Sequence, residues 1–274
     1  MRARPSLWDA VLLGLVQGPT ELLPVSSSAH IALLGRLRGA AGDPVDAQLR
    51  DSLEVALHAG TALALVLGGR RELARTVAEL DRGQLLAGAL ALGPPALVGY
   101  LCERSARARG GSPRALAAGL ACGGAALALA DLCPQRRRSA QAGPRDGLAL
   151  GVAQALALAP GVSRNGATLT AARARGFARA DAQVLSWRVG VPVLAGATLL
   201  KAWRARRRGV SPAARRTLAA GALAALASTL AAAPLIEPAR RGRRLAPFAL
   251  YRGALAVLAV RLGERPEPPA QRAQ

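Results

Sequence analysis

The chain has 274 residues, of which 51% are hydrophobic but only 3% aromatic, and its 37 Lys and Arg against 16 Asp and Glu give a net charge of +21. This charge alone suggests a phosphate-rich partner such as nucleic acid. Residues 83–102 and 217–236 contain no charge, however, and each is long enough to span a bilayer core. We therefore expect a membrane protein, and no nucleic-acid partner.

The apolar segments that follow one another along the chain are of two kinds. The first kind is continuous and uncharged, apart from Arg252 in the last segment, and predicts six spanning helices. In chain order these segments cover residues 55–69, 83–102, 115–130, 189–200, 217–236 and 245–260. Arginine-rich connectors such as Arg70–Arg71 and Arg136–Arg138 lie between them. Because these charges cannot lie in hydrocarbon, they mark the water interfaces.

Segments of the second kind, residues 10–34 and 147–170, are interrupted by Pro, Ser and charged or amide residues. Non-helical backbone at membrane depth survives only where protein or water satisfies its amides. We therefore predict that each segment forms a re-entrant hairpin of helix, loop and helix, with its polar loop inside the protein. The first segment contains Asp9 and leads into a polar motif, so we do not expect a removed signal peptide.

The two halves of the chain, residues 1–137 and 138–274, repeat one another. At an offset of 137, identical residues coincide at Asp9 and Asp146, Gly14 and Gly151, Gln17 and Gln154, Ser26 and Ser163, and Thr61 and Thr198. Each half contains three spans, so the second copy is upside down relative to the first. We predict an all-α polytopic membrane protein, with six transmembrane helices and two re-entrant hairpins in an inverted-topology repeat. It forms a single membrane domain, and residues 264–274 form a disordered tail.

The first hairpin, with GLVQGPTELLPVSSSAH at residues 14–30, gathers several reactive side chains. Glu21 is an acid in an apolar segment, where an ionisable residue is costly and therefore a functional candidate. Its carboxylate could hold a divalent cation or orient His30, which could act as nucleophile or general base. The hydroxyls of Ser26–Ser28 can donate to phosphate oxygens. The structural alternative is that the serines cap a helix and His30 is incidental.

The second hairpin contains GVAQALALAPGVSRNGAT at residues 151–168. Arg164 is the only charge between Asp146 and Arg173, and its guanidinium matches the geometry of phosphate. The small and polar neighbours that would complete a phosphate cradle are Ser163, Asn165, Gly166 and Thr168. The alternative is that Arg164 extends to the membrane interface and is solvated there.

Together these two segments closely resemble the signature regions of the undecaprenyl-diphosphatase family, the bacitracin-resistance membrane phosphatases that recycle the polyprenyl carrier of peptidoglycan synthesis. Further similar motifs are SLEVALHAGTALALVL at residues 52–67, GFARADAQVLSWRVGVPVLAGA at 176–197 and FALYR at 248–252. The resemblance covers nearly the whole chain. It implies hydrolysis of undecaprenyl diphosphate to the monophosphate and inorganic phosphate, by a multi-pass protein of the bacterial plasma membrane.

The resemblance also implies roles for the residues of both hairpins. Glu21 would bind Mg²⁺, Ca²⁺ or the diphosphate, and Ser27 and His30 would supply the nucleophile or base. The residues expected to contact the substrate phosphates are Ser26, Ser28, Ser163, Arg164, Asn165, Gly166 and Thr168, with Gln17 and Gln154 in support. Gln17, Asn165 and Arg188 depart from the usual family pattern, and Gln17 replaces a second glutamate of some members.

Two further expectations concern partners and a neighbouring histidine. The partners implied are the polyprenyl diphosphate substrate, membrane lipids and a second copy in a homodimer. An alternative function is a transporter or flippase of polyprenyl phosphate, because inverted repeats are common in transporters. Such a protein would need Arg164 but no nucleophile. His58 follows Glu54 by one helical turn, and a hydrogen bond within such a pair would support packing. This favours a structural role for His58, and the alternative is a supporting role behind the site residues.

Overall fold

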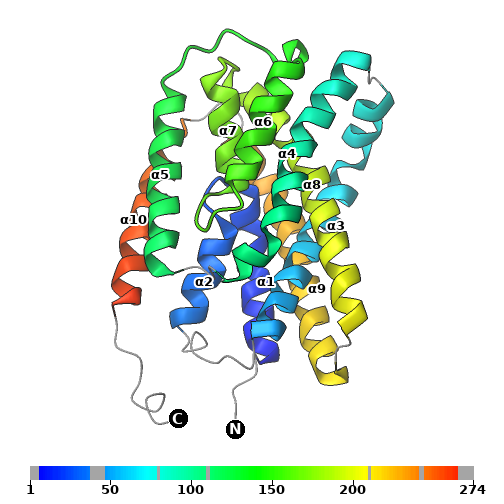
Figure 1. The fold of residues 1–274 in the computed structure, drawn as a ribbon, viewed down its shortest axis with the longest axis vertical. Helices are drawn as coiled ribbons and strands as arrows, with labels where there is room; N and C mark the ends of the chain where they lie inside the picture. The colour runs from blue at the N-terminus through cyan, green and yellow to red at the C-terminus, as the bar shows by residue number, and fades with distance from the viewer. Residues whose placement is uncertain are drawn as a thin grey trace.

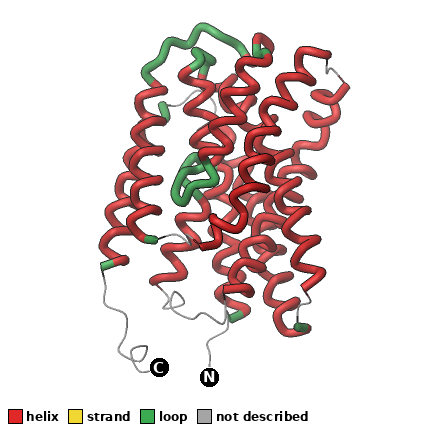
Figure 2. Tube along the Cα trace, viewed as in Figure 1, coloured by secondary structure: helices red, strands yellow, loops and turns green. Residues whose placement is uncertain are grey.

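A computed structural model describes residues 6–37, 47–78, 81–108, 112–208, 211–240 and 244–264. Apart from one isolated bridge between Arg137 and Phe177, regular structure in these residues is helical (Figures 1 and 2). The expected disordered tail falls outside the described residues, except for Glu264. The predicted all-α class is therefore confirmed over the described ranges.

Each of the six predicted spans coincides with a helix that is long and apolar enough to cross a membrane. These helices are α3 (Ala47–Ala78), α4 (Arg82–Ala108), α5 (Pro113–Asp131), α8 (Arg179–Arg208), α9 (Pro212–Arg240) and α10 (Ala246–Gly263). Between 11% and 33% of the most apolar window of each is buried inside the protein. The remaining apolar surface is suited to lipid, because bilayer tails are as apolar as the exposed leucines.

Both interrupted segments fold as two short helices joined by a loop. The first hairpin consists of α1 (Leu7–Leu22) and α2 (Ser27–Leu37), and the second of α6 (Pro144–Leu156) and α7 (Arg164–Ala174). In Figure 1, α1 and α2 occupy the lower half of the bundle and α6 and α7 the upper half. Contacts between the hairpins, such as the hydrogen bond of Asn165 with Leu22, show that the loops meet near the middle of the bundle (Figure 1).

Local sequence signals define how each hairpin begins. The side chain of Ser6 accepts from the backbone N–H of Asp9, and the Asp9 carboxylate accepts from that of Ser6, which completes a capping box for α1. Helix α6 begins with Pro144, whose missing N–H is not needed at that position. Asp146 then accepts from the N–H of Gly143 at 2.9 Å. The repeat mates Asp9 and Asp146 therefore both cap a hairpin helix.

Both hairpin loops contain a residue in the left-handed region. Gly161 has φ of +81°, and it lies so close to α5 that a Cβ there would meet the Leu116 carbonyl oxygen at 2.3 Å. Ser26 has φ of +71°, a conformation that costs a non-glycine residue about 1–2 kcal/mol. Ser26 is buried, and its carbonyl accepts from the backbone N–H of His30. Strain of this kind persists where the surroundings fix the backbone, commonly at functional sites.

The helices of one half pack against those of the other half. Helix α1 packs against α9, and its repeat mate α6 packs against α4. Glycines permit these close approaches, because a Cβ at Gly14 would lie 2.5 Å from the Gly221 carbonyl oxygen. A Cβ at Gly151 would lie 2.3 Å from that of Leu90. The hairpins are thus held between helices that come from both halves of the chain.

Ion pairs to one buried carboxylate fix the chain at the end of the bundle where α6 begins. The Asp146 carboxylate is paired with Arg137, at 2.8 Å, and with Arg175. Burial by itself would raise the pKa of Asp146, but the hydrogen bonds from both arginines outweigh it and hold the pKa well below its ordinary value. These ion pairs anchor the long connection between the halves against the turn that follows α7.

Candidate functional site

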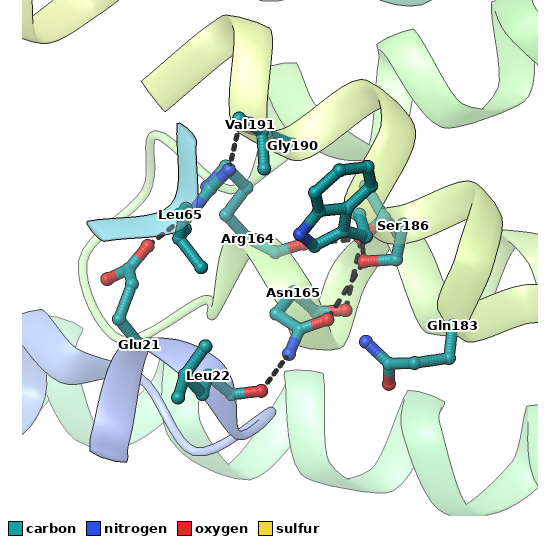
Figure 3. Close-up of a pocket in the computed structure, with 11 residues that line it drawn as sticks. Glu21, Leu22, Leu65, Arg164, Asn165, Gln183, Ser186, Gly190 and Val191 are labelled. Atoms are coloured by element: carbon teal, nitrogen blue, oxygen red, sulfur yellow. Dashed lines mark hydrogen bonds and ion pairs between the residues drawn. The ribbon is translucent and has the colours of Figure 1, made fainter. Parts of the chain in front are cut away.

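Glu21 and Arg164 meet between the two hairpins. The guanidinium of Arg164 donates through Nη2 to Glu21 Oε1 and through Nη1 to the carbonyl oxygen of Gly190 in α8 (Figure 3). The Glu21 side chain is only 8% exposed and that of Arg164 only 21%. A carboxylate from one hairpin is therefore neutralised by the arginine of the other, although 143 positions separate them in the chain.

The second oxygen of Glu21 is surrounded by three further side chains. Ser27 Oγ donates to Glu21 Oε2 at 2.5 Å, and Gln17 Nε2 donates to the same oxygen at 3.2 Å. His58 Nε2 in α3 lies 3.9 Å from it. The carboxylate is thus held in one orientation, and Ser27 is the hydroxyl in direct contact with it.

Asn165, Thr168 and Ser186 form a second polar group beside Arg164 (Figure 3). Asn165 Nδ2 donates to the carbonyl oxygen of Leu22 at 2.9 Å, while its Oδ1 accepts from Ser186 Oγ at 2.8 Å. Ser186 and Thr168 share a hydrogen bond of 2.6 Å between their hydroxyls. Asn165, one of the three departures from the family pattern, therefore joins the end of α1 to α8.

A pocket opens next to these groups, between α1, α3, α7 and α8. It is lined by Glu21, Leu22, Leu65, Arg164, Asn165, Thr168, Gln183, Ser186, Trp187, Gly190 and Val191. The lining combines the charged pair and its amide and hydroxyl neighbours with the apolar side chains of Leu65, Trp187 and Val191. A ligand with a charged head and an apolar body fits such a lining.

Ser163 and Gly166 lie at the start of α7. Ser163 is the N-cap residue, and its hydroxyl accepts from the backbone N–H of Gly166 at 3.2 Å. Gly166 has room only for hydrogen on its inner side, because a Cβ there would lie 2.5 Å from Arg252 Nη1. Arg164 is the first residue of this helix, so its guanidinium and the helix N-terminus, which favours anions, belong to the same part of the site.

His30 is held on the other side of the first loop. Its Nδ1 contacts the carbonyl oxygen of Ser26 at 2.8 Å, which requires Nδ1 to donate. Its Nε2 then accepts from the Tyr251 hydroxyl at 2.7 Å, and the two rings are stacked. The hydroxyls of Ser26 and Ser28 lie 3.3 Å apart. Like Ser27, none of the three residues lines the pocket, but the contacts that they make, unlike that of Ser27, do not include Glu21.

The two glutamines expected in support lie in different surroundings. Gln17 contacts Glu21, whereas Gln154 Nε2 donates to the Ala91 carbonyl oxygen of α4 at 3.1 Å. Pro95, four residues after Ala91, has no N–H to donate to that oxygen. Gln154 therefore satisfies a carbonyl that a proline leaves free, and it contributes to the packing of α6 against α4.

Sequence reasoning missed several residues that contact the site. Ser186, Gly190 and Tyr251 are 18 or more positions away from their partners, so no spacing pattern reveals them. The expected hydrogen bond between His58 and Glu54 is present, and it joins His58 Nδ1 to the Glu54 backbone oxygen at 2.9 Å. Arg188, unexplained by the sequence, is paired with Glu72 of α3 at 3.5 Å.

Metal ligands are sparse around the pocket. In the part of the chain that the structure describes, no group of three or more His, Cys, Asp or Glu side chains could hold an ion. Glu21 is the one carboxylate among the residues lining the pocket, and Arg164, Ser27 and Gln17 already contact its oxygens. The described residues therefore form no protein cage for a cation.

These features define a polytopic membrane protein with a polar site between two broken helical segments. The chain belongs to the bacitracin resistance protein BacA family, whose model matches residues 10–258. It is 36% identical to an undecaprenyl-diphosphatase of Geobacter metallireducens, over 89% of this chain and 93% of the relative. An undecaprenyl-diphosphatase of Rubrobacter xylanophilus is also 36% identical, over 93% and 98% respectively. That of Anaeromyxobacter dehalogenans is 40% identical, over 72% and 71%.

Proposed function

We propose that this protein is a multi-pass enzyme of the bacterial cell membrane that hydrolyses undecaprenyl diphosphate to undecaprenyl phosphate and inorganic phosphate. The reaction recycles the lipid carrier of cell-wall synthesis and gives resistance to bacitracin. The family membership and the names of the relatives support this activity. The observation in the site that carries it is the contact of Glu21 with both Arg164 and Ser27.

The charged pair suits the diphosphate head group. Arg164 donates to the Glu21 carboxylate through Nη2 and to the Gly190 carbonyl oxygen through Nη1. Phosphate oxygens would compete for the same planar set of donors, because a guanidinium binds phosphate and carboxylate alike. Ser163, Asn165, Gly166 and Thr168 lie in the first turns of α7 beside Arg164, and we assign them to the phosphate-binding set. Leu65 and Val191 would contact the start of the prenyl chain.

The hydroxyl of Ser27 is the nucleophile in this proposal. It donates to Glu21 Oε2, so the carboxylate can take its proton as the oxygen attacks the terminal phosphorus. The bond from that phosphorus to the bridging oxygen breaks, and undecaprenyl phosphate leaves. Water then hydrolyses the phosphoserine, which releases inorganic phosphate and restores Ser27. Arg164 stabilises the negative charge on the phosphoryl oxygens during both steps.

His30 has a positioning role in this proposal. Both of its ring nitrogens are engaged, with the Ser26 carbonyl and the Tyr251 hydroxyl. These contacts fix the loop conformation in which Ser26 has positive φ and Ser27 begins α2. His30 therefore holds the three preceding serines in place, and the same loop conformation brings the hydroxyls of Ser26 and Ser28 together. A transporter would need no hydroxyl positioned on a carboxylate, so the Ser27 contact favours hydrolysis.

A divalent cation such as Mg²⁺ or Ca²⁺ would bind together with the substrate. Mg²⁺ commonly takes one or two carboxylates and completes its ligands with substrate phosphates and water. Glu21 is the carboxylate available in the pocket, and Gln17 beside it offers an amide oxygen that has no hydrogen-bond partner. The ion would neutralise phosphate charge.

The placement of the hairpins in the membrane is also part of the proposal. We infer that α1–α2 and α6–α7 are re-entrant hairpins that enter from opposite faces, within one membrane domain made of residues 1–137 and 138–274 in inverted topology. The reciprocal packing of α1 on α9 and α6 on α4 supports this arrangement, as does that of α2 on α10 and α7 on α5. The expected homodimer stays a prediction.

Phosphate release from undecaprenyl diphosphate by the purified protein tests the activity, with and without added Mg²⁺ or Ca²⁺. We expect release to require Ser27, Glu21 and Arg164 and to fall when EDTA removes the cation. Phosphate covalently attached to Ser27 should accumulate after rapid mixing and quenching. Full activity of a folded Ser27→Ala variant would exclude the serine as nucleophile and return that role to His30 or water.

A further inference from the structure

Arg252 is a buried arginine that the proposed mechanism does not use. It lies in α10, one residue after Tyr251, and its side chain is fully buried. Nη1 lies 3.5 Å from the carbonyl oxygen of Pro24 in the first loop, and Nη2 lies 3.2 Å from that of Gly161 in the second. Nη2 also lies 3.3 Å from the Gly119 carbonyl oxygen of α5. A single guanidinium therefore joins both hairpin loops to α5.

The hydrogen bonds of Arg252 are long, and its charge is not neutralised by them. Every acceptor of its guanidinium among the described residues is a backbone carbonyl, and Nε has no partner. Arg173, also fully buried, has the carboxylate of Asp131 at 3.6 Å. An uncompensated charge inside a membrane protein is costly and marks a functional residue.

Further positive charge surrounds Arg252 and makes its own charge less favourable. Its Nη1 would lie 2.5 Å from a Cβ at Gly166, so the guanidinium is against the first turn of α7. The N-terminus of a helix carries about half a positive charge. Arg164 begins the same helix, so two arginines and a positive helix end lie at the first turn of α7, where Glu21 is the carboxylate paired with Arg164.

The surrounding chain leaves a space shaped for this side chain. A Cβ at Gly123 of α5 would lie 2.2 Å from Arg252 Nη2, so both Gly123 and Gly166 give the guanidinium room. A neutral side chain of similar length could also donate to carbonyls, so the hydrogen bonds by themselves do not require a cation. The charge requires a different explanation.

We propose that Arg252 is a second cation of the phosphate site, which raises the affinity for the diphosphate anion and fixes the two loops that hold it. This inference rests on the proposed function, because it takes the same site and the same anionic head group. Arg252 acts through the electrostatic field and through the loop carbonyls, so it is a positioning residue. The chemical class bound is a diphosphate, either of a polyprenyl lipid or inorganic.

The charge and the hydrogen bonds of Arg252 can be separated by substitution. Arg252→Lys keeps the charge, whereas Arg252→Gln keeps donors without it. We expect the full-length protein with lysine to bind inorganic pyrophosphate within about threefold of the wild type. With glutamine, we expect affinity for pyrophosphate to fall by at least about tenfold, because the positive charge near the anion is lost. KM for undecaprenyl diphosphate should rise in parallel, with a smaller change in kcat.

Two further variants keep the experiment decisive. If Arg252→Gln does not fold, Gly123→Ala displaces the guanidinium and should raise KM in the same direction. Arg164→Ala, measured alongside, reports on the site itself. Loss of pyrophosphate binding in Arg164→Ala but not in folded Arg252→Gln or Gly123→Ala would overturn the role of Arg252 alone. Unchanged binding in Arg164→Ala would instead overturn the site assigned under the proposed function, and absence of phosphate release by the wild type would overturn the activity.

Discussion

The first hairpin brings a carboxylate to the middle of the bundle, and the second brings a guanidinium. Ser27 and Arg164 are 137 positions apart, the offset of the repeat, and they begin the equivalent helices α2 and α7. Both donate to Glu21, one to each oxygen. The position equivalent to Glu21 in the second half is Leu158, which is 49% exposed. One repeated scaffold thus carries two different chemical functions.

This difference teaches how duplicated segments divide a site between them. The shared features are the ones that shape the backbone, such as the N-terminal aspartates, the glycines in α1 and α6 and the serines at the loop ends. The features that differ are the charges. Opposite charges on the two loops attract each other across the bundle, whereas a faithful copy would place two carboxylates face to face. The predictions below test this division.

Removing either member of the central pair should have the largest effect. We expect Arg164→Ala and Glu21→Gln each to lower kcat/KM for undecaprenyl diphosphate by about 10³-fold, because both act on the reacting phosphoryl group. Leu158→Ala, at the position equivalent to Glu21, should keep activity within about threefold. Phosphate release by purified variants measures this, and comparable losses at Leu158 and Glu21 would contradict an asymmetric site.

Comparing variants of Ser27 and of its neighbour Ser28 distinguishes a nucleophile from a hydroxyl that only shapes the loop. Ser27→Ala removes the hydroxyl in contact with Glu21 and should lower kcat by at least about 10²-fold. Ser28 contacts Ser26 instead, so Ser28→Ala should change kcat less than about tenfold. Single-turnover kinetics in detergent give both values. Equal losses would mean that the serines act as a group.

The repeat-related glycines should be equally sensitive to an added methyl group. Gly14→Ala and Gly151→Ala each force a Cβ against a backbone carbonyl of a helix from the other half, which should destabilise by about 2–3 kcal/mol. Gly35 has nothing within 4 Å of such a Cβ, so Gly35→Ala should be neutral or stabilising by up to about 1 kcal/mol. Thermal unfolding in detergent compares the three. A Gly151→Ala protein as stable as the wild type would contradict the prediction that α6 packs as closely as α1 does.

The capping aspartates should differ in their response to acid. The pKa of Asp146 is lowered in the folded state, so its stabilisation is complete above the unfolded value of about 3.9 and is lost as pH falls towards the folded pKa. We expect Asp146→Asn to cost about 2 kcal/mol at pH 7 and to flatten the pH dependence below pH 4. Asp9→Asn should cost at most about 1 kcal/mol, because Asp9 is the N3 partner in a capping box whose N-cap residue, Ser6, is kept. Melting temperatures of both variants between pH 3 and 7 measure these effects. An equal loss of stability and the same pH dependence in the two variants would contradict the prediction.

Much of the fold could be predicted because a segment that crosses the bilayer core must be long, apolar and helical. Uncharged runs such as residues 83–102 predict helices, and prolines and serines within apolar segments predict breaks. The predicted spans agree with α3, α4, α5, α8, α9 and α10, although the helices extend beyond the uncharged runs. The uncharged runs do not predict these extensions, because the backbone hydrogen bonds of the helices continue through arginine-rich ends into the interface, where charge is tolerated.

The sequence by itself determined the chemical types in the site, since Glu21, Ser27 and Arg164 stand out as polar residues in apolar segments. Only the tertiary structure decided which of them meet. It placed Ser27 on Glu21, turned His30 towards Tyr251, and brought Arg252 between the two loops. These contacts join residues from different helices, and their geometry depends on how glycine-lined helices pack. Local sequence patterns carry the helix period and the breaks, but contacts between distant segments follow from the packing of the whole bundle.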